Sequence, residues 1–241
     1  MGTTVVNSCA QPRLHAVTHT QLPAAVLWDM DGTLIDSEPY WIDAEMSLAT
    51  RFGVPWTHED AITLVGNPLD VSAQVLIGRG VKLTEAEVID SMVTEVSARA
   101  ASSMPWVPEA MALLDEVVAA GIPCALVTMS IGSLVDQFVE QAGDVFAAVV
   151  TGDQVASGKP SPEAYLLAAR RLGVDPSQCV AIEDSPVGIR SAHASGAATI
   201  AVPRYGESPV LDGITVLSTL EGVFLRDLAR ILYEHTTAVS L

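Results

Sequence analysis

Short apolar runs alternate along this chain with longer segments of helical periodicity. The apolar runs end at Asp29, Thr128, Thr151, Asp184 and Pro203, and a further one covers 214–217. Strands that alternate with helices are typical of a parallel sheet whose two faces are covered by helices. We therefore predict an α/β fold with a Rossmann-like, doubly wound core.

Three helices between these strands have clear ends. Their patterns cover 108–120, 161–172 and 185–195, and each is followed directly by a glycine. Glycine is common just past the C-terminal end of a helix because it adopts the left-handed conformation without strain. At the start of the second helix, Ser161 is expected to be the N-cap and Pro162 the first helical residue.

The segment between Asp36 and about Met104 has a different pattern. It contains no strand-like run and reads as consecutive helices over 39–52, 58–65, 69–77 and 84–102. We predict an inserted four-helix cap, with hinges near Asp36 and near 103–105 that let it close over a site. The predicted division is a flexible extension (1–22), a core (23–36 and 105–232), the cap (37–104) and a C-terminal tail (233–241).

Two carboxylates follow the first apolar run in the string Asp29-Met-Asp31-Gly32-Thr33. Residues two apart in an extended segment point to the same side, so Asp29 and Asp31 can share one site. Gly32 permits the tight backbone exit that such a site needs. Like charges held this close require a cation or a proton. A hard divalent ion with oxygen ligands meets that need, and an aspartate in such a site can also act as a nucleophile toward phosphorus.

Complementary groups follow three later strands. Thr128 ends one strand, Lys159 lies in a loop rich in Gly and Pro before a helix, and Glu183 and Asp184 form a second acid pair. Ligands of open parallel sheets bind outside the carboxyl ends of the strands. We therefore expect all of these groups to meet there.

The motifs DMDGTLIDSEPYW, GKPSPEAY and IEDSPVGIRSAHASG resemble the haloacid dehalogenase-like (HAD) superfamily over residues 24–230. Within it they are similar to the branch of beta-phosphoglucomutase and small sugar-phosphate phosphatases, whose members carry a helical cap. The resemblance implies a phosphatase that forms an aspartyl-phosphate. Haloacid dehalogenation itself is disfavoured, because the acid pair and a metal would have no part in it.

The resemblance also implies roles for individual residues. Asp29 would be the nucleophile and Asp31 the general acid/base, while Thr128 would hydrogen-bond the phosphoryl oxygens and Lys159 would neutralise charge there. Magnesium would be held by Asp29, the backbone carbonyl of Asp31 and Asp184, with Glu183 as a further candidate ligand. The remaining candidates for substrate binding are Gly32, Thr33, Met129 and Ser130 beside these motifs, and Glu38, Trp41 and Asn67 in the cap.

The cap sequence departs from the mutase pattern. Mutase-like caps have a His twelve positions after the nucleophile and a basic residue in a Gly-centred loop, whereas this chain has Trp41 and a loop, 65–70, without a cation. A second phosphate group needs charge-assisted partners. We therefore favour hydrolysis of a sugar or polyol phosphate. An intramolecular phosphomutase is the alternative, and a catalytically silent binding protein is the third hypothesis.

Composition limits the partners. The 241 residues are 49% hydrophobic, enough for a sizeable core. A net charge of −17, with only 12 Lys and Arg, argues against nucleic acid and anionic membranes. We expect a small phosphorylated metabolite as substrate, and a monomer or weak homodimer.

Cysteine usage and the N-terminal sequence bear on location. The three cysteines, Cys9, Cys124 and Cys179, give neither a disulfide framework nor a metal-ligand spacing. No run is long and apolar enough for a membrane helix, and 1–22 lack the features of a signal peptide. The expected location is the cytoplasm.

Overall fold

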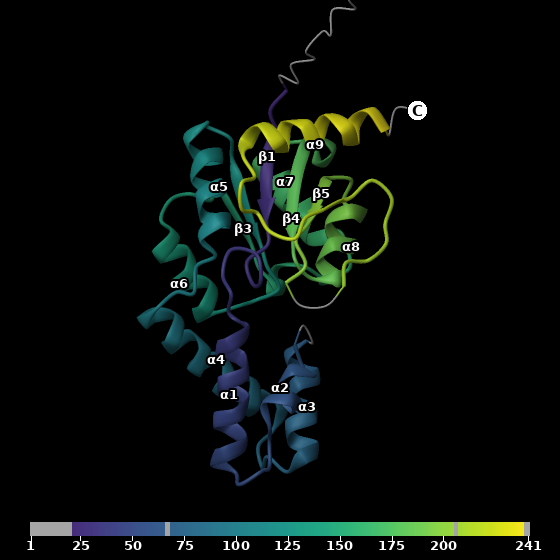
Figure 1. Ribbon diagram of the computed structural model, residues 1–241. Helices are drawn as coiled ribbons and strands as arrows, with labels where there is room; N and C mark the ends of the chain where they lie inside the picture. Colours follow the sequence, from purple (N-terminus) through teal and green to yellow (C-terminus); the bar gives the residue numbers. More distant parts are fainter. Residues whose placement is uncertain (1–20, 66–67, 205–206, 239–241) are drawn as a thin grey trace, which may run out of the picture.

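The computed structural model describes residues 21–65, 68–204 and 207–238, and its centre is a parallel sheet (Figure 1). The strands are β1 (Ala25–Trp28), β2 (Cys124–Val127), β3 (Ala148–Val150), β4 (Cys179–Glu183), β5 (Ala198–Ala201) and β6 (Thr215–Val216). Their order is β3-β2-β1-β4-β5-β6, and every pair is parallel. The predicted α/β fold is confirmed, and each strand ends within two residues of its predicted end.

The strand order reverses at β1. The chain adds β2 and β3 on one side of β1 and then β4, β5 and β6 on the other. The register places Trp28 beside both Leu126 and Ile182, so the loops after β1, β2 and β4 leave the sheet at nearly the same level. In doubly wound folds, the crevice at such a reversal is the usual place for a ligand.

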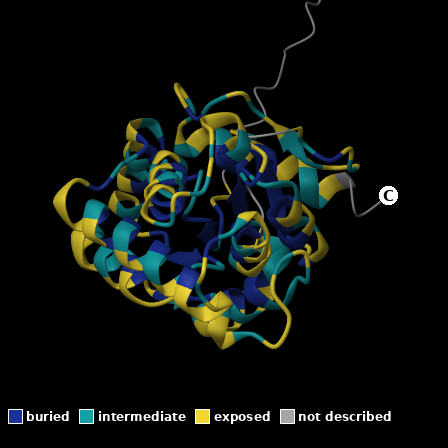
Figure 2. Cartoon of the chain, turned by 90° about the horizontal axis from the view of Figure 1, so that it is seen from below, coloured by how far each residue is buried: buried dark blue, intermediate teal, exposed yellow. Residues whose placement is uncertain are grey.

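Helices cover both faces of the sheet. One face packs against α5 (Pro108–Ala119), α6 (Ser133–Ala142) and α9 (Leu225–Ala238), and the other against α7 (Glu163–Leu172) and α8 (Pro186–Ala194). In β1, Val26 and Trp28 point to the first face, and Ala25 and Leu27 to the second. Because both faces are covered, every residue of β1, β2, β4 and β5 is buried (dark blue in Figure 2), and most of these residues are apolar.

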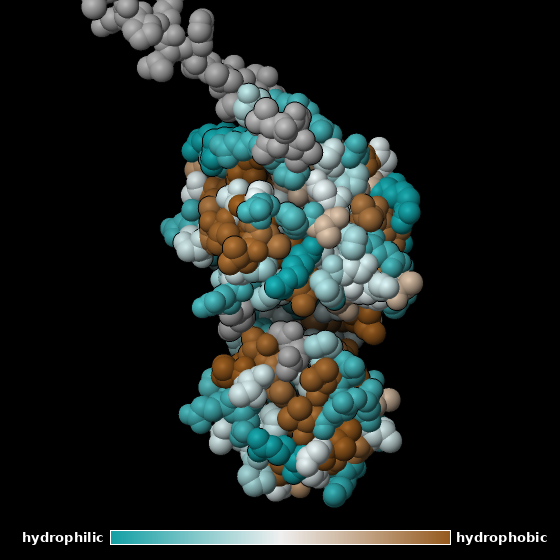
Figure 3. Space-filling model, turned by 90° about the vertical axis from the view of Figure 1, so that its right-hand side faces the viewer, coloured by the Kyte–Doolittle hydropathy of each residue, from teal (hydrophilic) through white to brown (hydrophobic). Residues whose placement is uncertain are grey.

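The insertion forms a helical lobe below the carboxyl ends of the strands (Figure 1). Its helices are α1 (Glu38–Arg51), α2 (His58–Ile62), α3 (Leu69–Arg79) and α4 (Glu85–Ser102). Helices α2 and α4 begin with capping boxes. The side chains of Thr57 and Thr84 accept a hydrogen bond from the backbone N–H of the third helical residue. Figure 3 shows the lobe joined to the core through a narrow waist. Two linkers cross it, and they pair through the bond from Asp36 N to Pro105 O (2.8 Å).

Several details differ from the sequence predictions. Helix α6 was not predicted, and α9 runs through Ala238, six residues into the segment predicted as a tail. Helix α7 begins at Glu163, so Ser161 precedes its N-cap instead of forming it. Short 3-10 turns, η1 (Gly152–Gln154) and η2 (Pro176–Gln178), precede α7 and β4. The predicted extension lies outside the described residues except for Gln21 and Leu22.

Both described cysteines, Cys124 and Cys179, are buried and free. None of the helices within the described ranges has the length and apolar character to span a membrane.

Candidate active site

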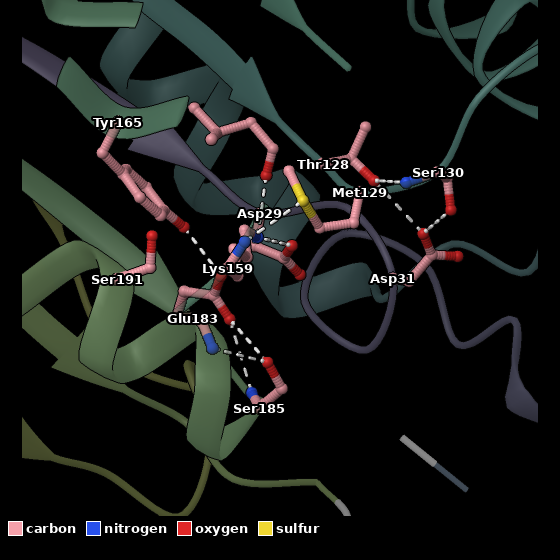
Figure 4. Close-up of polar contacts among 12 residues, drawn as sticks. Asp29, Asp31, Thr128, Met129, Ser130, Lys159, Tyr165, Glu183, Ser185 and Ser191 are labelled. Atoms are coloured by element: carbon pink, nitrogen blue, oxygen red, sulfur yellow. Dashed lines mark hydrogen bonds and ion pairs between the residues drawn. The ribbon is translucent and has the colours of Figure 1, made fainter. Parts of the chain in front are cut away.

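Lys159 holds the first carboxylate after β1 in one orientation (Figure 4). Its Nζ lies 2.6 Å from Asp29 Oδ1, 2.5 Å from Glu183 Oε1 and 3.0 Å from the carbonyl oxygen of Val127. These three bonds use all three ammonium protons. The other oxygen of Asp29, Oδ2, is buried and has no hydrogen-bond partner in the described part of the chain. Asp29 therefore presents one fixed and one uncommitted oxygen at the strand reversal.

Glu183 is held from several sides. The hydroxyl of Tyr165 donates to Oε1 at 2.8 Å, and the backbone N–H and hydroxyl of Ser185 donate to Oε2 at 3.4 and 3.3 Å. A Cβ at Gly188 would lie 2.0 Å from the carboxylate, so only glycine fits there. Tyr165 was not among the predicted site residues, because in an apolar helical stripe it reads as a core residue. Its hydroxyl reaches Glu183 only in the folded chain.

Asp31 accepts hydrogen bonds from three hydroxyl groups and has no hydrogen bond to Lys159. Ser37 donates to its Oδ1 at 2.6 Å, and Ser130 and Thr128 donate to its Oδ2 at 2.7 and 3.4 Å. The backbone N–H of Ser130 also donates to Thr128 Oγ1 at 2.9 Å. Ser37 is the N-cap residue of α1, but it makes no side-chain cap bond, because its hydroxyl is directed to Asp31.

Three carboxylates can share a metal ion. Asp29, Glu183 and Asp184 are all buried, and each offers an oxygen within 4.8 Å of the others. Burial and then the charge of Glu183 raise the pKa of Asp29 to about 7, and burial with the charge of Asp29 raises the pKa of Asp184 to about 9. Burial alone would lower the pKa of Lys159, but the charges of Asp29 and Glu183 raise it overall.

One ammonium therefore faces three carboxylates, one of which has a buried, unpaired oxygen. An all-oxygen donor set with excess negative charge suits a hard divalent cation. The side chain of Asp31 instead accepts hydrogen bonds from the hydroxyls of Ser37 and Ser130. Its backbone carbonyl therefore remains the atom that is predicted to bind the metal.

Gly32 makes room for Asp184. Its φ is +83°, and a Cβ there would lie 2.0 Å from Asp184 Oδ2. Arg204, which the sequence analysis did not select, donates from Nε to the carbonyl oxygen of Gly32 at 3.0 Å and from Nη1 to Asp36 Oδ2 at 3.3 Å. The loop after β5 therefore braces both the turn after β1 and the first linker.

The remaining predicted residues lie around this centre. Thr33 is buried, and the sulfur of Met129 accepts the backbone N–H of Lys159 at 3.4 Å. Burial and then the charge of Asp31 raise the pKa of Glu38, the first residue of α1, to about 7. Trp41 is half-buried and packs partly against the core. Asn67 lies outside the described residues.

Known proteins share this sequence pattern and fold. A family model described as haloacid dehalogenase-like hydrolase matches residues 26–202. Hexitol phosphatase A of Escherichia coli strain K12 is 32% identical over 202 residues, which are 82% of this chain and 91% of that protein. Fructose-1-phosphate phosphatase of the same strain is 33% identical over 178 residues, 72% of this chain and 93% of that protein.

Among solved structures, CbbY from Rhodobacter sphaeroides in complex with xylulose-1,5-bisphosphate has a TM-score of 0.71 and 27% identity. The match covers 84% of this chain and 96% of that one. The predictions that this chain is a hydrolase, that it is a phosphatase and that it is a member of this superfamily are confirmed. The chain belongs to the haloacid dehalogenase-like hydrolase family.

Proposed function

We propose that this enzyme is a magnesium-dependent phosphatase that hydrolyses a sugar or polyol phosphate through an aspartyl-phosphate on Asp29. The observation that carries the proposal is the state of Asp29: Lys159 holds Oδ1, and the buried Oδ2 has no partner within the described ranges. A carboxylate fixed in this way needs no rotation before it attacks phosphorus. The named activities of the two Escherichia coli relatives support the substrate class.

The carboxylates of Asp29 and Asp184 and the backbone carbonyl of Asp31 would hold Mg²⁺. Glu183 is the least available ligand, because both of its oxygens already accept hydrogen bonds. When bound, the ion supplies positive charge that offsets the repulsion between the anionic phosphate and Asp29.

In the first step, Asp29 Oδ2 forms a bond to phosphorus as the bond from phosphorus to the leaving oxygen breaks. The leaving alkoxide takes a proton from Asp31. The hydroxyls of Thr128 and Ser130, which already gather at Asp31, would donate to the phosphoryl oxygens. Lys159 keeps the charge and direction of Asp29 fixed, which is the positioning and neutralisation that phosphoryl transfer requires.

In the second step, a water molecule attacks the phosphorus of the aspartyl-phosphate and gives its proton to Asp31. The bond from phosphorus to Asp29 breaks, and inorganic phosphate leaves. Asp31 is thereby protonated again, so the cycle returns both carboxyl groups to their starting states.

The cap supports hydrolysis over mutase activity. A bisphosphate intermediate needs cations in the cap to bind its second phosphate group. Of the cap cations, Arg99 pairs with Asp43 and Glu95, and Arg79 pairs with Asp60. Arg51 and Lys82 are exposed. The half-buried Trp41 stands where a mutase-like cap has a His.

A phosphate-release screen over a panel of phosphorylated metabolites, with and without magnesium, tests the proposal. We expect release from sugar or polyol phosphates that stops in excess chelator and returns with Mg²⁺. Activity that persists in chelator would overturn the metal assignment. Isomerisation of a sugar phosphate that depends on added bisphosphate, with little phosphate release, would identify a mutase instead.

A further inference from the structure

One face of α1 carries acidic groups from the site into the cap. Glu38 begins the helix, and Glu45 lies seven residues later, so helical geometry places the two almost directly above one another. Trp41 lies between them on nearly the same side. The charge of Asp31 acts on Glu38, and the charge of Glu38 acts on Glu45. The three carboxyl groups therefore form a line that starts at the proposed acid/base.

Glu45 is an unusual group for a helix-bundle interior. Only 5% of its surface is exposed, and its Oε2 has no hydrogen-bond partner among residues 21–65, 68–204 and 207–238. Burial of a polar atom without a partner costs free energy, and native proteins contain few such atoms. Glu45 Oε2 therefore has an unused capacity for a hydrogen bond.

We infer that Glu45, together with Trp41 and Glu38, binds hydroxyl groups at the end of the substrate remote from the phosphate and selects a polyhydroxylated ester long enough to reach it. This inference rests on the proposed function and deepens it. Neither Glu38 nor Glu45 offers the positive charge that a second phosphate group would need at this end. Trp41 is half-buried, and its ring offers an apolar surface of the kind that packs against the carbon skeleton of a sugar.

The charge state of Glu45 favours a hydroxyl over a cation as its partner. Burial and then the charge of Glu38 raise its pKa to about 8, so the group is largely uncharged at neutral pH. An uncharged carboxyl both donates and accepts, as does a hydroxyl.

The helix also sets the length of the ligand. Seven residues correspond to a rise of about 10 Å from Glu38 to Glu45. An extended hexitol phosphate reaches farther along this helix than glycerol 3-phosphate does, so we expect the longer ester to be the one that contacts Glu45.

The test compares sorbitol 6-phosphate with glycerol 3-phosphate for the wild type, Glu45→Met, Glu45→Gln and a control, Glu59→Gln, which changes an exposed cap residue. We expect the wild type to prefer the longer ester. Glu45→Met should lower kcat/KM for sorbitol 6-phosphate about tenfold more than for glycerol 3-phosphate, mainly through KM, since a hydrogen bond is lost. Glu45→Gln keeps a donor and an acceptor and should recover most of the preference, and Glu59→Gln should retain all of it.

The melting temperature separates binding from a structural role. Methionine has a similar shape and no unpaired oxygen, so Glu45→Met should melt at the same temperature as the wild type or higher. A lower melting temperature, with both esters affected equally, would overturn the inference. So would a wild type without preference for the longer ester. Absence of phosphate release from every ester would instead overturn the proposed function, and this inference with it.

Discussion

The substitution Gly32→Ala should separate metal binding from folding. Gly32 has a φ of +83°, and the added Cβ would lie 2.0 Å from Asp184 Oδ2 and 2.5 Å from its Cγ. Ordinary contact begins near 3.4 Å, so the carboxylate must retreat by more than about 1 Å. Metal-ligand distances tolerate only about 0.2 Å. Asp184 would therefore leave the donor set.

The expected size of the effect follows from comparable changes around metal ligands. Disturbing a group that positions a ligand typically weakens metal binding about 10- to 100-fold. The strained backbone should also lower the free energy of unfolding by about 1–2 kcal/mol. We therefore expect a 10- to 100-fold rise in the magnesium concentration that gives half-maximal phosphate release, together with a modest loss of stability.

Gly196→Ala is the matched control. Gly196 has a similar φ of +87°, but apart from its chain neighbours no atom lies within 4 Å of a Cβ built there. Both variants should lose similar stability in denaturant unfolding, whereas only Gly32→Ala should require more magnesium in the activity assay and in calorimetric titration. Equal magnesium requirements for the two variants would refute the assignment of Asp184 as a ligand.

Three further changes test other parts of the site. Asp31→Asn should slow formation of the aspartyl-phosphate far more with a sugar phosphate than with para-nitrophenyl phosphate, because an alkoxide needs a proton to leave; equal losses in single-turnover rates would refute the acid role. Tyr165→Phe removes a donor to Glu183 and should lower the unfolding free energy by about 1.5–3 kcal/mol; unchanged denaturant curves would argue against that bond. For Glu45, the pKa rises from 4.5 unfolded to about 8 folded, so the folded state binds the proton more tightly and stability should fall as pH rises through this range. Glu45→Met should remove the part of this pH-dependent loss of stability that comes from Glu45. Melting temperatures that change in parallel with pH in the variant and the wild type would contradict this expectation.

The sequence was most informative about the ends of the central strands. Residues such as Asp29 and Glu183 directly follow or end apolar runs, and parallel topology brings those ends together, so local patterns predicted a meeting of distant groups. Helices followed by glycine were also predicted well. Helix α6 was missed although it lies between Gly132 and Gly143 and is as long as α7, which was predicted.

The contacts within the site depended on tertiary structure. A serine that directly precedes a helix reads as a cap, yet the Ser37 hydroxyl donates to Asp31, in the turn after β1, and makes no side-chain cap bond. Tyr165 and Arg204 carried no local signal of function: one lies in an apolar helical stripe and the other in a loop. Glu45 likewise reads as a polar position on a helix, and only its burial without a partner distinguishes it.

Chemical trapping of the phosphorylated enzyme tests the central claim most directly. The enzyme is mixed with a substrate carrying radioactive phosphate and magnesium, quenched in acid within the first turnover, digested and mapped by mass spectrometry. The account predicts label on the peptide that contains Asp29, and no label in Asp29→Asn, whose melting temperature should stay close to that of the wild type. Label on another residue, or steady phosphate release by Asp29→Asn, would contradict it.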